Sequence, residues 1–91
     1  MYNPNEIVKF NVSGVLKDLN RRYHRNYTVK DVADRVGVTR ETISRLTTKS
    51  AFSLIYSVAG CIYDLYPEYS EYWNFADFVQ LLAYDDHSFI L

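Results

Sequence analysis

The stretch TVKDVADRVGVTRETISR, residues 28–45, decides the fold of this 91-residue chain. It predicts two short helices joined at Gly37. Thr28 followed three residues later by Asp31 is a pair of capping residues, which predicts a helix over residues 29–36. Gly37 can take the positive φ that a tight turn between two helices requires. Thr39 can cap the next helix, which we expect to run from residue 40 to about residue 48.

The two predicted helices have the residues that they need to pack against each other. Ala33 is small, so the second helix can cross the first closely at that point. The other inward positions of the stretch are all apolar: Val32, Val36, Val38, Ile43 and Leu46. A helix pair locked together in this way is therefore expected at residues 28–48.

A further helix is expected before this pair. Asn3-Pro4-Asn5-Glu6 is typical of a helix start, and apolar residues then recur every three or four positions up to Tyr23. An alternative makes Glu6–Phe10 a short strand and starts the helix after Asn11. Basic residues suit the carboxyl end of this helix, and Asn26 is the expected stop.

Two more helices are expected after the pair. Ser50 can cap the first of them, and Pro67 fixes its end. Asn74 can cap the second, and residues 85–91 are expected to be a tail. An alternative is that Phe89–Leu91 docks or pairs as a short strand. The apolar stripes of these two helices are Leu54, Ile55, Val58, Ile62 and Leu65, and Phe75, Phe78, Val79 and Leu82. The predicted fold is thus an all-α, compact bundle of about five helices with possible short terminal strands, in a single domain spanning residues 1–91.

Charge divides the chain into two halves. Residues 1–50 hold all ten Lys and Arg residues and five acids, a net charge of +5. Residues 51–91 hold six acids and no Lys or Arg, a net charge of −6, and eleven of the 15 aromatic residues. This asymmetry predicts a basic face for a polyanion and an acidic, aromatic half that touches protein.

Several classes of site are not expected. The single cysteine, Cys61, excludes an internal disulfide and a cysteine-based zinc site. Asp85-Asp86-His87-Ser88 holds acid, base and hydroxyl types, but consecutive residues do not easily converge on one centre. His24 is expected to be exposed at a helix end. We therefore expect no metal, no cofactor and no enzymatic activity. The longest uncharged run, Ser50–Tyr63, has 14 residues against roughly 20 for a membrane span.

Residues 28–45 resemble the helix-turn-helix of the Cro-and-repressor type regulators of phages and bacteria, and they are also similar to the headpiece motif of the Lac-repressor family. The expected preceding helix and the lack of room for an effector-binding domain favour the first family. The resemblance covers about residues 12–66, the expected DNA-binding core. It implies a small transcriptional repressor that binds double-stranded DNA in the cytoplasm of a bacterial or phage-infected cell, at the nucleoid.

The resemblance also implies which residues touch DNA. The second helix of the motif enters the major groove with its amino-terminal end at the bases. The expected base contacts are Thr39, Arg40, Glu41, Ser44, Arg45 and Thr48, and the expected phosphate contacts are Thr28, Lys30 and Lys49. Helical spacing agrees for the base contacts, because Ile43 and Leu46 face inward. An alternative for Glu41 and Arg45 is a surface ion pair. Val29 stands where the family often has a Gln that contacts the DNA backbone.

Residues 67–91 are expected to be an extension for dimerisation or partner binding. Paired regulators read two half-sites, so we expect a homodimer. Its expected interface is Tyr69, Tyr72, Trp73, Phe75 and Phe78. An alternative is a monomer in which these aromatic residues wrap over the first and fourth helices. An alternative function is a protein interaction module, an adaptor or an inhibitor, built on a helix-turn-helix scaffold and binding a protein through residues 51–91.

Overall fold

The computed structural model describes residues 7–83, which form six α-helices and no sheet. The helices are α1 (Val12–Tyr23), α2 (Val29–Val36), α3 (Arg40–Ser44), α4 (Phe52–Leu65), α5 (Pro67–Ser70) and α6 (Phe75–Leu82). The predicted all-α bundle is confirmed. It has one helix more than expected, because Pro67 both follows α4 and starts the single turn of α5. The predictions for Asn3–Glu6, for Asp85–Ser88 and for Phe89–Leu91 lie outside the described residues.

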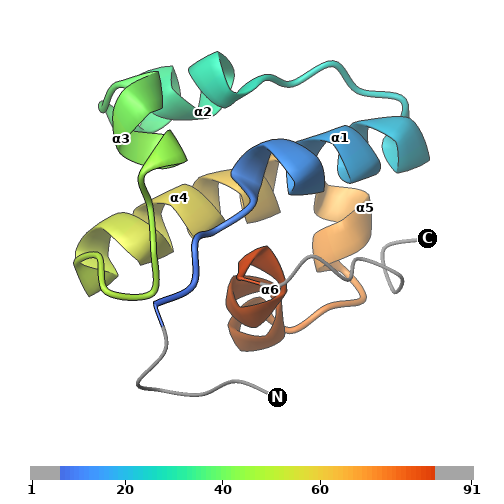
Figure 1. Cartoon of the computed structure of the whole chain (residues 1–91). Coiled ribbons are helices and arrows are strands. Elements are labelled where there is room, and N and C mark those ends of the chain that lie inside the picture. The colour runs from blue at the N-terminus through green and yellow to red at the C-terminus, as the bar shows by residue number, and fades with distance from the viewer. Residues whose placement is uncertain (1–6, 84–91) are drawn as a thin grey trace.

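The helix α4 lies at the centre of the molecule. Figure 1 shows α2 and α3 on one side of it and α5 and α6 on the other, and α4 contacts α2, α5 and α6. One face of α4 is buried, through Ile55, Val58, Ala59, Ile62 and Leu65. Four of these five residues belong to the predicted stripe, and Leu54, the fifth residue of that stripe, is only half-buried.

The start of α1 differs from the main prediction and follows the alternative. The Asn11 side chain accepts a hydrogen bond from the Gly14 N–H at 3.1 Å, so it caps a helix that begins at Val12. A Cβ at position 14 would lie 2.3 Å from the side-chain nitrogen Nδ2 of Asn11, so glycine leaves room for this cap. The helix predicted across residues 7–11 is therefore wrong. At the other end, His24 takes a left-handed conformation (φ 58°) and ends α1 before Asn26.

The turn between α2 and α3 forms as predicted. Thr28 and Asp31 make a complete capping box, and α2 spans the predicted residues. Gly37 adopts φ +88°, and its N–H donates to the Ala33 carbonyl at 2.8 Å. The Val38 N–H donates to the same carbonyl at 3.0 Å. These bonds satisfy the end of α2 and direct the chain into α3.

The helix α3 ends at Ser44, earlier than the predicted end near residue 48. The following residues pair with the chain before α1 instead. The Phe10 N–H donates to the Leu46 carbonyl at 2.9 Å, and Lys9 and Thr47 form an isolated antiparallel bridge. Ser50 is occupied in the same turn, since its hydroxyl accepts from the Thr47 N–H at 3.0 Å. The prediction that Ser50 caps α4 is wrong, because Ala51 holds that position without a side-chain bond.

A buried tyrosine joins the two halves of the chain. The Tyr66 hydroxyl donates to Asn20 Oδ1 at 2.5 Å, and Asn20 Nδ2 donates to the Tyr27 carbonyl at 2.7 Å. The Tyr27 N–H donates back to Asn20 Oδ1 at 3.1 Å. Burial raises the pKa of Tyr66 to about 12, so the phenol keeps its donor proton. The network fixes the loop between α1 and α2.

We predict that Gly37→Val destabilises the protein. The space around a Cβ at this position is open, so the loss of stability comes from backbone strain at φ +88° and not from a clash. The left-handed conformation costs an L residue about 1–2 kcal/mol, and a β-branched residue more. In the control Gly60→Ala the new Cβ also meets open space. Because Gly60 lies inside α4, this change should raise stability by about 0.5–1 kcal/mol. Urea unfolding measures both, and equal stability of Gly37→Val and wild type contradicts the prediction.

We predict opposite results for two buried tyrosines. Tyr66→Phe removes the bond to Asn20 and lowers stability by about 0.5–1.5 kcal/mol. The Tyr69 hydroxyl is buried without a hydrogen-bond partner in the described part of the chain. Tyr69→Phe therefore leaves stability unchanged or raises it by up to about 1 kcal/mol, because an unpaired buried hydroxyl is costly. Thermal unfolding compares the pair, and a larger loss for Tyr69→Phe than for Tyr66→Phe excludes this interpretation.

Candidate nucleic-acid interface

Five of the predicted base-contact residues share one exposed surface at α3. Arg40, Glu41 and Ser44 lie on the helix, Arg45 ends it and Thr39 caps it, and all five are exposed. We call these five residues the recognition surface. They face outward because Ile43 and Leu46, each 1% exposed, hold the opposite side in the core.

The sixth predicted base contact, Thr48, lies elsewhere. It follows the end of α3, and its hydroxyl accepts from the Val8 N–H at 3.1 Å. Its own N–H donates to the Val8 carbonyl at 2.9 Å. Thr48 therefore anchors the segment before α1, and its predicted place on an exposed helix face is wrong. The prediction failed because it extended α3 by one turn.

The charged side chains of the recognition surface form no ion pairs within residues 7–83. The ion pairs found within residues 7–83 are Arg21–Asp18, Arg25–Glu68 and Lys30–Asp34. The alternative of a surface pair between Glu41 and Arg45 is thus not observed. Within α3 the Ser44 hydroxyl donates to the Glu41 carbonyl at 3.1 Å, and the Thr39 hydroxyl accepts from the Thr42 N–H at 3.1 Å. The two guanidinium groups remain available to a ligand.

The predicted phosphate contacts have structural partners of their own. Thr28 caps α2: its hydroxyl accepts from the Asp31 N–H at 3.2 Å, and its N–H donates to the Asp31 carboxylate at 2.8 Å. Lys30 reaches Asp34 at 2.8 Å, but both side chains are largely exposed, so the pair is weak and can open. Lys49 is exposed in the turn that follows α3. Val29 packs against the core rather than toward solvent.

The recognition surface lies in the part of the chain that holds all the described cations. Every described Lys and Arg precedes α4, while α4, α5 and α6 contain none. In Figure 1, α2 and α3 lie across α4 from α5 and α6, so the recognition surface lies away from these two acidic helices. The two halves meet elsewhere, since Arg25 pairs with Glu68 at 2.7 Å and Arg35 and Asp64 flank one groove.

The aromatic residues of the extension are distributed differently from the prediction. Tyr69 and Phe78 are 1% and 0% exposed, so they cannot present a surface to a partner, and the prediction is wrong for them. Trp73 and Phe75 are half-buried and pack against the core. Of the five predicted interface residues, only Tyr72 is freely exposed, at 82%. The buried pair follows the alternative in which the aromatic residues cover the core.

Sequence reasoning missed two exposed aromatic residues. Phe52 and Tyr56 are 73% and 51% exposed, and their stacked rings lie 6.1 Å apart on α4. Their spacing of four residues places them on one face of a helix, and neither belongs to the predicted inward stripe. That pattern was visible in the sequence and could have singled them out.

The described residues contain no group of His, Cys, Asp and Glu side chains that could hold a metal ion. None of the helices in residues 7–83 has the length and apolar character needed to cross a membrane.

This geometry is that of a helix-turn-helix with an exposed, cationic second helix. Residues 19–52, about a third of the chain, match the family model described as sigma-70, region 4, which is a helix-turn-helix DNA-binding domain. The match runs from the middle of α1 to the first residue of α4. No curated protein and no solved structure matches the chain significantly. The chain thus carries a DNA-binding helix-turn-helix, whereas the narrower resemblance to Cro-type repressors stays a prediction.

We predict that the Thr28–Asp31 capping box makes stability depend on acid. The hydrogen bonds from the Thr28 N–H and hydroxyl hold the pKa of Asp31 below its ordinary value of 3.8. A carboxyl with a lowered folded pKa stabilises above its unfolded pKa and loses that contribution as pH falls through the folded value. The stability difference between wild type and Asp31→Asn should therefore shrink below about pH 4.

Urea unfolding at pH 7 and pH 3 measures this difference. The matched control is Asp64→Asn, which changes an exposed carboxyl on α4 that makes no hydrogen bond within the described residues. If the wild-type advantage over Asp31→Asn were the same at both pH values, the capping carboxylate would not have the assigned role.

Proposed function

We propose that the protein is a sequence-specific DNA-binding regulator of transcription, a small repressor that reads the major groove with its recognition surface. The observation that carries this proposal is the exposure of Arg40 and Arg45 on α3 without an ion-pair partner in residues 7–83. An Arg guanidinium can donate two hydrogen bonds to one guanine. Glu41 can accept from a cytosine amine, and the Thr39 and Ser44 hydroxyls can adapt to several bases.

The five-residue length of α3 is compatible with this role. In helix-turn-helix proteins the amino-terminal residues of the second helix contact the base edges. The recognition surface comprises the cap, the first turn and the end of α3. Lys49 and Lys30 would contact phosphates beside it. The acids of α5 and α6, across α4 from the recognition surface, favour an orientation with that surface toward DNA.

Repression would follow from occupation of a promoter, by a homodimer that covers two half-sites. Such a protein acts where the chromosome is, at the nucleoid in the cytoplasm of a bacterial or phage-infected cell. We expect no catalytic activity. The alternative, an adaptor or inhibitor built on the same scaffold, is favoured by the exposed Phe52 and Tyr56. An adaptor has no need for two unpaired arginines on α3, so we prefer the regulator.

We predict salt-sensitive binding to duplex DNA that depends on α3. Affinity should fall with salt with a slope near −0.9 per phosphate contact. Arg40→Ala or Arg45→Ala should weaken binding to a selected duplex by about 1–3 kcal/mol and relax the base preference. Lys49→Ala should weaken binding to all duplexes alike. The measurement is electrophoretic mobility shift, with duplexes selected from a random library and with the DNA upstream of the protein's own gene.

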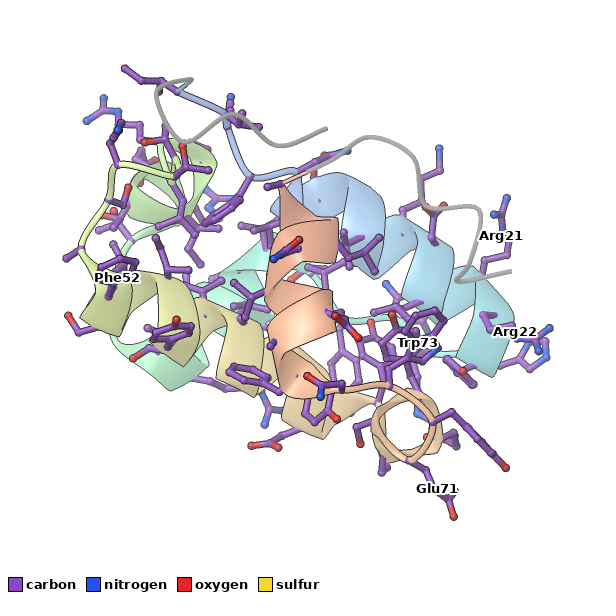
Figure 2. The ribbon with its side chains drawn as sticks, turned by 90° about the horizontal axis from the view of Figure 1, so that it is seen from below. Arg21, Arg22, Phe52, Glu71 and Trp73 are labelled. Atoms are coloured by element: carbon purple, nitrogen blue, oxygen red, sulfur yellow. The ribbon has the colours of Figure 1, made fainter. Side chains whose placement is uncertain are left out.

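The matched control is Arg22→Ala. Arg22 is an exposed cation at the end of α1, at the opposite end of the molecule from α3 (Figure 2). The Arg22→Ala substitution should change the affinity for DNA little and leave the base preference unchanged. A wild-type protein that binds no duplex at low salt, or an Arg22→Ala variant as defective as Arg40→Ala, would overturn the proposed function.

A further inference from the structure

One side of α4 places exposed aromatic rings beside an apolar hollow. Phe52 and Tyr56 form a ridge, and the Tyr56 ring also lies 6.1 Å from the Phe75 ring of α6. Next to the ridge is a hollow of about 220 Å³. Besides the two ridge residues, its lining is Phe10, Thr48, Ile55, Val79, Gln80 and Ala83.

We propose that a second copy of this chain docks on this face, with Phe52 of each copy in the hollow of the other. A two-fold axis brings identical patches together, so the patch must complement itself. A projecting ring beside a hollow on the same face has that property, because rotation by 180° about an axis between them exchanges the two. The walls of the hollow are apolar apart from Thr48 and Gln80, which suits an aromatic ring.

The lack of charge on this face also favours a second copy of the chain as its partner. Like charges repel across a two-fold axis, so a self-pairing patch needs a surface without net charge. Among residues 7–83, no charged residue lines the ridge or the hollow, and α4 has none before Asp64. Asp77 of α6 does not line the hollow, although it is one helical turn from Gln80, which does. Of the acids that the structure describes in this half, none lines the patch.

Other exposed faces of the second half are less suited. The exposed Tyr72 is next to Glu71, and Figure 2 shows Glu71 projecting from the α5 end, far from Phe52. The groove between α2 and α4 is flanked by Arg35 and Asp64 and has no projecting apolar side chain except Tyr56. The face around Phe52 thus replaces Tyr69 and Phe78 as the dimer surface.

The role of this dimer rests on the proposed function. Phe52 opens the helix that follows the turn after α3, so pairing there links two recognition surfaces (Figure 1). Two aromatic residues per copy expose on the order of 500 Å² in total, given about 200 Å² for one such side chain. Stable interfaces bury about 1,200–2,000 Å². We therefore expect a micromolar dimer that DNA with two half-sites strengthens.

Sedimentation equilibrium of the full chain tests the proposal, over protein concentrations from about 1 to 500 μM, which bracket a micromolar dissociation constant. Wild type should shift from 10.7 kDa toward twice that mass as concentration rises. Phe52→Glu and Gln80→Glu place a charge on the ridge and in the hollow, and each should weaken dimerisation at least tenfold. Both side chains are exposed, so circular dichroism should show intact folding. The matched control Tyr72→Glu changes the other exposed aromatic residue and should leave the dimer unchanged.

Three results would overturn the proposal: a wild type that is monomeric throughout, dimerisation that survives both glutamate variants, or an equal loss in Tyr72→Glu. The chain after Ala83 contains another candidate occupant of the hollow, Phe89–Leu91. If replacing all three residues by Ser converted a monomeric wild type into a dimer, the patch would belong to the chain's own end. Mobility shift on the same samples separates the two proposals. A monomer that still binds duplex DNA overturns only the dimer, and a dimer that binds no duplex overturns only the regulator.

Discussion

The rest of the structure depends on the packing of the uncharged part of α4 between the helix-turn-helix and the acidic extension. Residues 51–63 carry no charge, so α4 can be covered by α2 on one side and by α5 and α6 on the other without burying an ion. Its buried residues form one continuous core with both halves. This central position keeps the recognition surface on α3 away from the acidic helices α5 and α6.

Tyr66 and the extension that follows it do more than carry charge, because they help to hold the DNA-binding half in place. Tyr66 follows α4 directly, yet its hydroxyl reaches Asn20 in α1, and its ring packs edge-on against Tyr27 at 5.5 Å. Glu68 binds Arg25 in the loop between α1 and α2. That loop leads into the Thr28 cap, so the orientation of α2, and through Gly37 that of α3, depends on residues beyond α4. The helix-turn-helix is thus held in part by contacts from residues that follow α4.

Local signals in the sequence predicted the parts of the fold that local interactions decide. The capping box at Thr28, the glycine turn and the Asn74 cap involve residues within four positions of each other, and all formed as expected. The start of α1 and the end of α3 were mispredicted for one shared reason: the segment around Lys9 pairs with the segment around Thr47. A pairing between residues nearly forty positions apart produces no hydrophobic periodicity in the sequence. The burial of Tyr69 and Phe78 was likewise invisible to a count of aromatic residues, since a count cannot say which rings meet.

The same long-range pairing explains how a five-residue helix can present a defined surface. An isolated helix of this length is unstable in water, since nucleation costs more than its few bonds return. Here α3 is held from both ends. Gly37 and the Thr39 cap set its start, and beyond its end Leu46 is buried and bonded to Phe10. Arg40 and Arg45 thus project from a backbone whose conformation is set by distant residues. A rigid backbone loses less entropy when its side chains bind, so a short helix fixed in this way suits the base contacts that we propose.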